Sequence, residues 1–584
     1  MFNKTNYIFG FILLIAVLLT SCKSGKKEDI SIIQGNVEQL VNWTDEYVES
    51  RVKKDKLDGG LSVMIYSGTE VIYNNGAGWA DKSKEIELNS GTPMPVGSIS
   101  KIFTSVAIMK LVENGKLELD SAVGSYLPML ELADGEEMNI TVRDLLTHHS
   151  GIQGDLFENW FNGDKEELYG LLKDRPLASN TEKFHSYANI GFSLLGLIIE
   201  EISGETYSDF VRDNIFIPSG MKNSLVYPGE IEKELPRGYR DGSDISVPVI
   251  RDIPAGGLLI SSEDMGLFIK SLYGDESVIL KKETLKKMLT VQNRDNLIDR
   301  KFEIGLGFWL IDPINSGELM ASHGGDLPPY HSILITMPNS DLAVFVATND
   351  HNKDGFLAIE SALDIIKQVM VFNGKERPEP KDRGEFLTVD EQTQKTFSGT
   401  YNTLGGVITV EPKGDAFMLT LAGKKLYFAP KDNGLYGVQF KLFNKITIPV
   451  PQLEMMEFDM FEAEGNVWMS LWMGGIYMGA FSKLSETEYP ESFEKIVGEY
   501  IINSDNNILE DGSRAIDDVG ISYKNNLYIL EITMLGQKLN MALRSDGDSR
   551  AFTDGKGRAM GDLLVFNNDD ESLNWSGFTL TKKK

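Results

Sequence analysis

The chain has 584 residues, too many for one compact core, so its length predicts several domains. Its composition, with 42% hydrophobic and 24% charged residues, is typical of a globular protein and excludes wholesale disorder. The formal net charge of −29 predicts a surface that repels phosphate backbones, which argues against nucleic-acid binding.

The N-terminus has the pattern of a secretory signal peptide over residues 1–21. A positive Lys4 precedes a short apolar run, Ile8 to Leu19, which is too short for a comfortable membrane span. Cys22 is the chain's one cysteine, and the residues before it resemble the lipobox of bacterial lipoproteins. We therefore expect residues 22–34 to be a polar tether and a lipid on Cys22 to anchor the protein in a bacterial cell envelope. A plain signal peptide or an uncleaved anchor is the alternative.

Residues 35–372 have alternating helix and strand patterns, as expected of a mixed α/β or α+β domain. Residues 59–81 and 331–350 each predict two strands joined by turn residues. Two further helices are predicted by their N-terminal caps. The capping pairs are Thr141 with Asp144 and Ser261 with Asp264.

Residues 373–390 are rich in proline and charge and predict a linker. After it, short alternating strands separated by Gly, Asn and Asp predict an all-β region. The region is internally repeated, because "FSGTY" (397–401) recurs as "IVGEY" (496–500). We expect two small barrel-like domains, 391–489 and 490–584.

A serine-x-x-lysine pattern occurs at Ser98 and Lys101, but the spacing alone is weak evidence. The same pattern also occurs at Ser24/Lys27, Ser50/Lys53, Ser219/Lys222 and Ser492/Lys495. Ser98 differs in context, because it opens an almost entirely apolar helix, Ile99 to Val112, which predicts burial. Residues three apart share a helix face, so the Lys101 amine is expected near the Ser98 hydroxyl. A helix-capping serine with a snorkelling lysine is the alternative.

Two downstream stretches complete an ordered triplet. Tyr187–Ala188–Asn189 precedes a second apolar helix, and His323–Gly324–Gly325 enters a predicted hairpin. Ser-x-x-Lys, then Tyr-x-Asn, then a basic residue and glycine on a strand resembles the serine β-lactamase and penicillin-binding-protein superfamily. The resemblance covers about residues 35–370. It is strongest to the class C β-lactamase-like branch, which includes D-aminopeptidases and β-lactamase-like esterases.

The resemblance implies a fold and a set of roles. The fold would be a central antiparallel sheet flanked by helices, in an α/β (α+β) domain, followed by the two all-β domains. Ser98 would be the acylated nucleophile, Lys101 would take or relay its proton, and Tyr187 would be the general base. Asn189 would position the substrate amide. The backbone N–H groups of Ser98 and Asp326, the latter just after Gly324–Gly325, would form the oxyanion hole. No metal or cofactor is implied.

Three features depart from the family pattern. His323 replaces the lysine of many penicillin-binding proteins, which makes strong β-lactamase activity doubtful and would make carboxylate binding depend on pH. Asp326 places a carboxylate beside the oxyanion hole, where it either pairs with a substrate amine or turns away into solvent. Pro328–Pro329–Tyr330 also replaces the family's Pro-Gly-aromatic turn.

Other candidate residues favour structural roles. His148 and His149 are adjacent, and adjacent helical residues do not share a face on which to bind a metal. His185 and His331 are close to the motifs in sequence, but packing or surface roles are favoured. The aromatic and methionine stripe of residues 467–481 resembles a binding surface, although alternation in a barrel core explains it at least as well.

These patterns predict a lipid-anchored serine hydrolase that acts on amide or ester bonds. The substrates expected are small molecules or peptides: D-amino-acid peptides, peptidoglycan fragments or esters. A D-aminopeptidase or D-Ala carboxypeptidase type of peptidase is the first hypothesis. The alternatives are a β-lactamase-fold esterase and a penicillin-binding module with little or no turnover.

Overall fold

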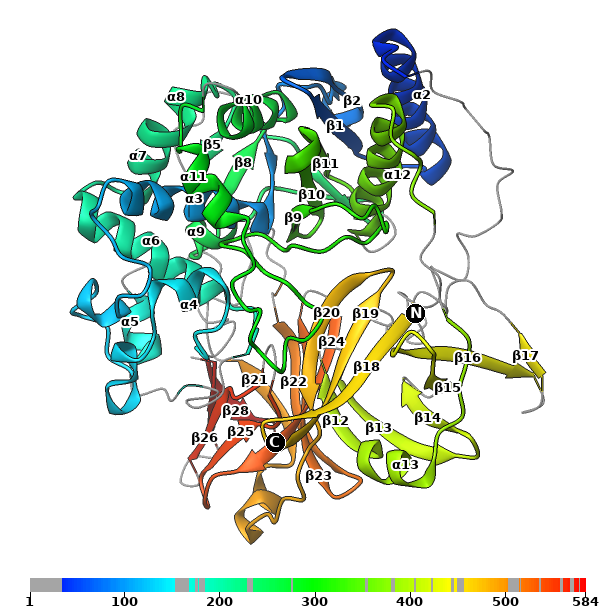
Figure 1. Cartoon of the computed structure of the whole chain (residues 1–584). Helices are drawn as coiled ribbons and strands as arrows, with labels where there is room; N and C mark the ends of the chain where they lie inside the picture. Colours follow the sequence, from blue (N-terminus) through cyan, green and yellow to red (C-terminus); the bar gives the residue numbers. More distant parts are fainter. Residues whose placement is uncertain are drawn as a thin grey trace.

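The structure of the chain is a computed structural model (Figure 1). It describes residues 34–583 apart from these stretches: 153–166, 174–176, 178–183, 228–234, 275–276, 352–354, 380–383, 404–405, 422–423, 443–445, 449–455, 503–513, 515, 535–536, 557–559, 568–571 and 577. The predicted signal peptide and Cys22 lie outside the described residues. Within the described part of the chain, no helix combines the length and apolarity needed to cross a bilayer.

The N-terminal domain is built on a six-stranded antiparallel sheet in the order β3-β2-β1-β11-β10-β9. Its strands are β1 (Gly60–Ser67), β2 (Glu70–Asp81), β3 (Ile86–Glu87), β9 (Ala321–Leu327), β10 (Tyr330–Met337) and β11 (Leu342–Thr348). The two predicted hairpins are confirmed, because β1 pairs with β2 and β10 with β11. The strand β9, which contains the third motif, lies at the edge of the sheet.

Helices cover both faces of this sheet (Figure 1), which confirms the predicted architecture. Successive side chains of a strand point to opposite faces, and on β1 Val63 and Ile65 join one core while Met64 and Tyr66 join the other. The first core includes α2 (Val37–Asp55) and α12 (Phe356–Phe372). The larger core holds α3 (Ser100–Glu113), α4 (Val142–Leu146), α5 (Glu167–Leu172), α6 (Asn189–Ser203), α7 (Tyr207–Val211), α9 (Ile253–Gly256), α10 (Ser262–Tyr273) and α11 (Lys282–Met288).

Smaller elements connect these layers. They are the strands β4 (Met94–Pro95), β5 (Leu225–Val226), β6 (Gly238–Arg240), β7 (Ser243–Ile245) and β8 (Leu258–Ile260), and the helix α8 (Ile217–Ser219). Both predicted helix caps are present. The Thr141 side chain accepts a hydrogen bond from the Asp144 N–H at the start of α4, and Ser261 accepts one from the Asp264 N–H at the start of α10.

The rest of the chain forms the two predicted barrel-like domains. The first β domain begins with helix α13 (Glu391–Phe397) and contains β12 (Gly399–Thr403), β13 (Gly406–Lys413), β14 (Ala416–Leu421), β15 (Lys424–Pro430), β16 (Tyr436–Leu442), β17 (Ile446–Ile448), β18 (Met456–Ala463), β19 (Asn466–Met473) and β20 (Ile476–Ser482). The second β domain is a closed barrel of β21 (Gly498–Ile502), β22 (Ile516–Lys524), β23 (Leu527–Met534), β24 (Gln537–Ser545), β25 (Arg550–Thr553), β26 (Leu563–Asn567), β27 (Ser572–Trp575) and β28 (Phe578–Lys582).

The first β domain is an open path of strands whose ends come together. A β-bridge between Tyr401 of β12 and Lys483 brings the first strand beside the end of β20. Part of the predicted linker also belongs here. The N–H of Leu387 donates to the Pro430 carbonyl, and Val389 lies in the core of this domain. The composition of residues 373–390 predicted a spacer, whereas its second half lies against the first β domain through the backbone of Leu387 and the buried side chain of Val389.

Candidate active site

Ser98 lies in a short 3₁₀ turn, Gly97–Ile99, between β4 and the first residue of α3. The sequence predicted that Ser98 opens the helix, but α3 begins two residues later. Gly97 has a φ of +48°, and a Cβ there would come within 2.6 Å of the backbone N of Asp326 on β9. Only glycine permits both this conformation and this approach. The turn therefore holds the half-buried Ser98 directly against the edge strand.

Lys101 is completely buried. Its Nζ donates to Ser98 Oγ at 3.2 Å, to Asn189 Oδ1 at 2.7 Å and to the Ala255 carbonyl of α9 at 2.7 Å. These three acceptors match the three hydrogens of an ammonium group. The structure therefore brings Ser98, Lys101 and Asn189 together, although α6 begins far from α3 in the sequence.

Tyr187 lies just before α6 and is also buried. The Lys101 Nζ is 4.8 Å from the centre of the Tyr187 ring. The His148 ring packs on the Tyr187 ring at a tilt, with the two ring centres 4.3 Å apart. The Ala188 N–H donates to His148 Nδ1 at 3.1 Å, which requires that nitrogen to be unprotonated. Burial, with the nearby His185 and the Lys101 charge, keeps the His148 pKa well below its ordinary value, so the imidazole stays neutral.

His323 is buried on β9, 2% exposed, and stacks on Trp309 with ring centres 4.8 Å apart. Its Nδ1 donates to the Gly324 carbonyl at 2.6 Å. Burial and the charge of Lys101 lower its pKa to about 3, so it is neutral at physiological pH. With this lowered pKa the structure gives no support to the expected pH dependence of carboxylate binding, because residue type alone does not reveal this burial.

Gly325 is needed for close packing of β9 against the segment before Ser98. A Cβ at Gly325 would lie 1.8 Å from the Val96 carbonyl oxygen and 2.4 Å from Ser332 Oγ. Ser332, across the hairpin on β10, donates to that same Val96 carbonyl at 2.9 Å. The glycine thus lets the Val96–Ser98 segment and the edge strand meet.

Asp326 points to the sheet face opposite His323, because strand residues alternate. Its Oδ1 pairs with the Nδ1 of His331, its cross-strand partner on β10, at 2.7 Å. His331 Nε2 in turn lies 2.8 Å from the Nδ1 of His351. The 71% exposed carboxylate thus turns away from the His323 face and has His331 as its polar partner. Sequence reasoning considered His331 but did not pair it with Asp326, because only the hairpin register joins the two.

The adjacent residues His148 and His149 make packing and hydrogen-bond contacts. His149 Nε2 lies 2.7 Å from Asp299 Oδ2, whose other oxygen accepts the His185 N–H at 2.9 Å. Burial alone would raise the Asp299 pKa, but the hydrogen bonds and charge of His149 more than offset it, so the pKa is lowered. Within the described ranges, no three His, Cys, Asp or Glu side chains are grouped to hold a metal ion.

Comparison with known proteins confirms the resemblance. The family model described as Beta-lactamase matches residues 45–366. The PbpX protein of Bacillus subtilis (strain 168) is 30% identical over 262 residues, 42% of this chain and 64% of that protein. Penicillin-binding protein 4* of the same strain is 24% identical over 405 residues, 64% of this chain and 86% of that protein. The chain therefore spans less than two thirds of PbpX and most of the second relative.

A solved structure shows the same fold over a longer range. The crystal structure of SurE with D-Leu matches with a TM-score of 0.56 and 19% sequence identity. The match covers 76% of this chain and 100% of that one. It extends the shared architecture beyond the segment matched by the family model.

Proposed function

The chain belongs to the β-lactamase family, and from this premise we propose that it is a serine hydrolase that forms an acyl-enzyme on Ser98. Members of this family are generally serine hydrolases. The observation that carries the proposal is the position of the Lys101 ammonium. It contacts Ser98 Oγ and Asn189 and lies over the ring of Tyr187, so both motifs that precede β9 meet at one charge.

In the proposed mechanism, Ser98 Oγ attacks the carbonyl carbon of an amide or ester while its proton passes to Tyr187. The Lys101 ammonium stabilises the negative charge on the phenol oxygen. The bond to the leaving group then breaks, and Tyr187 returns the proton to the leaving nitrogen or oxygen. Water attacks the acyl ester in the second step, which releases the acid and restores Ser98.

The oxyanion would be bound by the backbone N–H groups of Ser98 and Asp326. Gly97 supports this assignment, because its close approach brings the two peptide groups to one place. The role of Asn189 would be to orient both Lys101 and the substrate amide. Neutral His323, with Gly324 and Gly325, would shape the edge of the cleft and supply no positive charge.

This charge distribution favours one class of substrate. A substrate bound through its own carboxylate needs a cation, and His323 is neutral. We therefore favour amides or esters of D-amino acids over substrates with a C-terminal D-Ala carboxylate. SurE was solved with D-Leu; that likeness is of fold alone, and it guides only the choice of probe. A β-lactamase-fold esterase is the second candidate, since the same site accepts either bond.

For the cell, we propose that a lipid on Cys22 anchors the enzyme in the bacterial envelope. The support is the signal-peptide pattern and the position of Cys22 after it. Mass spectrometry of the mature N-terminus tests this directly. An unmodified Cys22, or an N-terminus elsewhere, would contradict it.

The test of the proposed reaction is labelling with a fluorescent penicillin and a fluorophosphonate. We expect wild type to be labelled, and Ser98→Ala to lose labelling and about 10⁴-fold or more of turnover. The matched control is Ser219→Ala, which removes the serine of another Ser-x-x-Lys pattern and should retain both.

Rates with D-Leu-p-nitroanilide and p-nitrophenyl butyrate separate amidase from esterase. Intact-protein mass spectrometry shows whether the acyl group persists, as a penicillin-binding module with little turnover requires. A folded wild type that neither probe labels and that turns over neither substrate would refute the proposal.

A further inference from the structure

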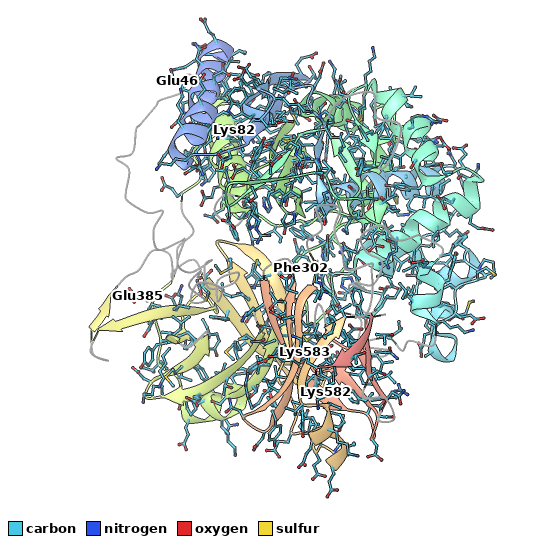
Figure 2. All side chains as sticks on the ribbon, turned by 180° about the vertical axis from the view of Figure 1, so that it is seen from behind. Glu46, Lys82, Phe302, Glu385, Lys582 and Lys583 are labelled. Atoms are coloured by element: carbon cyan, nitrogen blue, oxygen red, sulfur yellow. The ribbon has the colours of Figure 1, made fainter. Side chains whose placement is uncertain are left out.

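An aromatic cluster joins the N-terminal domain to the first β domain. Its buried members are Phe184, Ile298, Phe302 and Ile304 from the N-terminal domain and Phe461, Trp468, Trp472, Tyr477 and Ala480 from β18–β20. Phe302 lies at the junction between the helical and β parts of the molecule (Figure 2). We name this set the interdomain cluster.

Its contacts are specific in geometry. Phe302 stacks on Tyr477 with ring centres 4.2 Å apart and an angle of 19°. Beside the stack, Arg300 Nε donates to Asp459 Oδ2 at 2.7 Å. The Asp459 side chain is only 3% exposed, so its charge needs this partner. Arg300 also lies over the ring of Phe461, 4.7 Å from its centre.

The interdomain cluster leads to Tyr187 through two histidines. The ring of His185, two residues before Tyr187, is 4.5 Å from Phe302 and 5.9 Å from Tyr477. It also contacts the His148 ring at 5.6 Å, and His148 packs on Tyr187. An unbroken set of ring contacts therefore extends from β20 to the proposed general base.

A second connection leads to β9. Trp309 packs against the interdomain cluster and stacks on His323. It is also bonded to β9 through its backbone, because its N–H donates to the Ser322 carbonyl at 2.9 Å. The same cluster thus supports two of the three motifs, while Ser98 and Lys101 are held within the N-terminal domain by α3, α6 and α9.

We propose that the docked first β domain positions the Tyr187 segment and β9 for acyl transfer, with Tyr477 and Asp459 as positioning residues that touch no substrate. The inference rests on the proposed function, and it assigns the β domain a role in the reaction rather than only in binding partners. Loss of docking would displace Tyr187 and His323 relative to Ser98 and Lys101. A displacement of about 1 Å at such groups lowers rates by about 100-fold.

The test reverses the Arg300–Asp459 pair. We expect Arg300→Asp to lower kcat for the better of the two chromogenic substrates by about 10- to 100-fold while KM changes less than about threefold. The double variant Arg300→Asp/Asp459→Arg should recover at least half of the loss. Arg550→Ala, which removes an exposed arginine–aspartate pair in the second β domain, is the matched control and should leave kcat unchanged.

Two further measurements distinguish a loss of positioning from a loss of folding and from a failure of the proposed function. Tyr477→Leu keeps an apolar side chain but removes the stack, and it should lower kcat in the same direction. Hydrogen exchange of peptides spanning residues 184–190 needs no turnover and should be faster in Arg300→Asp and Tyr477→Leu than in wild type.

Unchanged exchange and unchanged kcat in both folded variants would overturn the inference. If wild type proves inactive, the proposed function fails, and the exchange result alone decides whether the first β domain positions this segment.

Discussion

The two β domains share a tyrosine–carbonyl hydrogen bond at their first strands, and they differ in what their outer faces contact. In the first domain the Tyr401 hydroxyl donates to the Phe397 carbonyl at 2.8 Å, and in the second the Tyr500 hydroxyl donates to the Ile496 carbonyl at 2.6 Å. The end of each domain returns a lysine to the same place. Lys483 Nζ donates to the Thr396 carbonyl and Lys582 Nζ to the Lys495 carbonyl. The repeated "FSGTY" and "IVGEY" segments therefore form equivalent structures.

The outer faces are different. In the first domain, β19 is buried on both faces from Trp468 to Met473, because one face fills the barrel and the other meets the N-terminal domain. In the second domain, β21 and β28 alternate buried with exposed residues, as strands with one face in water do. The first copy thus has an aromatic face that meets the N-terminal domain, whereas the second meets the first β domain, where Asn402 Nδ2 donates to the Asp554 carbonyl at 2.8 Å.

The largest expected effect compares two buried tryptophans. Trp468 lies in the interdomain cluster and Trp575 in the core of the second β domain, and both are at most 1% exposed. Each change to alanine should lower the free energy of unfolding of its own domain by about 3–5 kcal/mol. Only Trp468→Ala should also lower kcat.

Calorimetry and steady-state kinetics on the two variants check this contrast. An equal loss of kcat in folded Trp575→Ala would remove the functional distinction between the two domains.

A second contrast is the response to acid. All six histidines of the chain lie between residues 148 and 351. Burial lowers the pKa of His323 and of His351 to about 3, from 6.5. Below pH 6.5 the unfolded chain therefore binds protons that the folded domain does not. The free energy of unfolding of the N-terminal domain should fall by up to about 1.4 kcal/mol per pH unit for each such histidine as the pH falls from 6.5 towards 3.

The second β domain should respond with the opposite sign. Burial raises the pKa of Asp554, so its folded form takes up a proton at a higher pH than the unfolded chain does. Its contribution to stability therefore grows as the pH falls. Hydrogen exchange measured at pH 7.5 and 5.5 should show faster opening in the N-terminal domain and no acceleration around Asp554. Uniform acceleration would contradict the contrast.

The smallest expected effect tests the tyrosine–carbonyl hydrogen bond that the two β domains share. Tyr401→Phe and Tyr500→Phe each remove one hydroxyl that donates to a carbonyl, and each should cost about 1 kcal/mol of its domain's free energy of unfolding. Urea titrations followed by exchange in each domain give the two values. Costs that differ by more than about threefold would show that the two tyrosines are not equivalent.

Features made of neighbouring residues were predictable from the sequence. The Thr141–Asp144 cap and the two hairpins of the N-terminal domain depend on local hydrogen bonds and on alternation, both of which leave a pattern in the sequence. The approach of Lys101 to Ser98 was predictable for the same reason. The alternation of residues 467–481 was visible too. Aromatic residues on the outer face of a strand give the same sequence pattern whether that face meets water or another domain.

Sequence alone thus determined the mixed α/β class, the order of the three motifs and the repeat in the β region, because each follows from residue types at short spacing, and the arrangement of the sheet was implied by the family resemblance. Only the tertiary structure decided that His323 is neutral, that Asp326 pairs with His331 and that Trp468 and Trp472 face the N-terminal domain. Burial, cross-strand register and domain docking arise between segments far apart in the chain. Their free energies depend on which surfaces meet, and no local pattern records that.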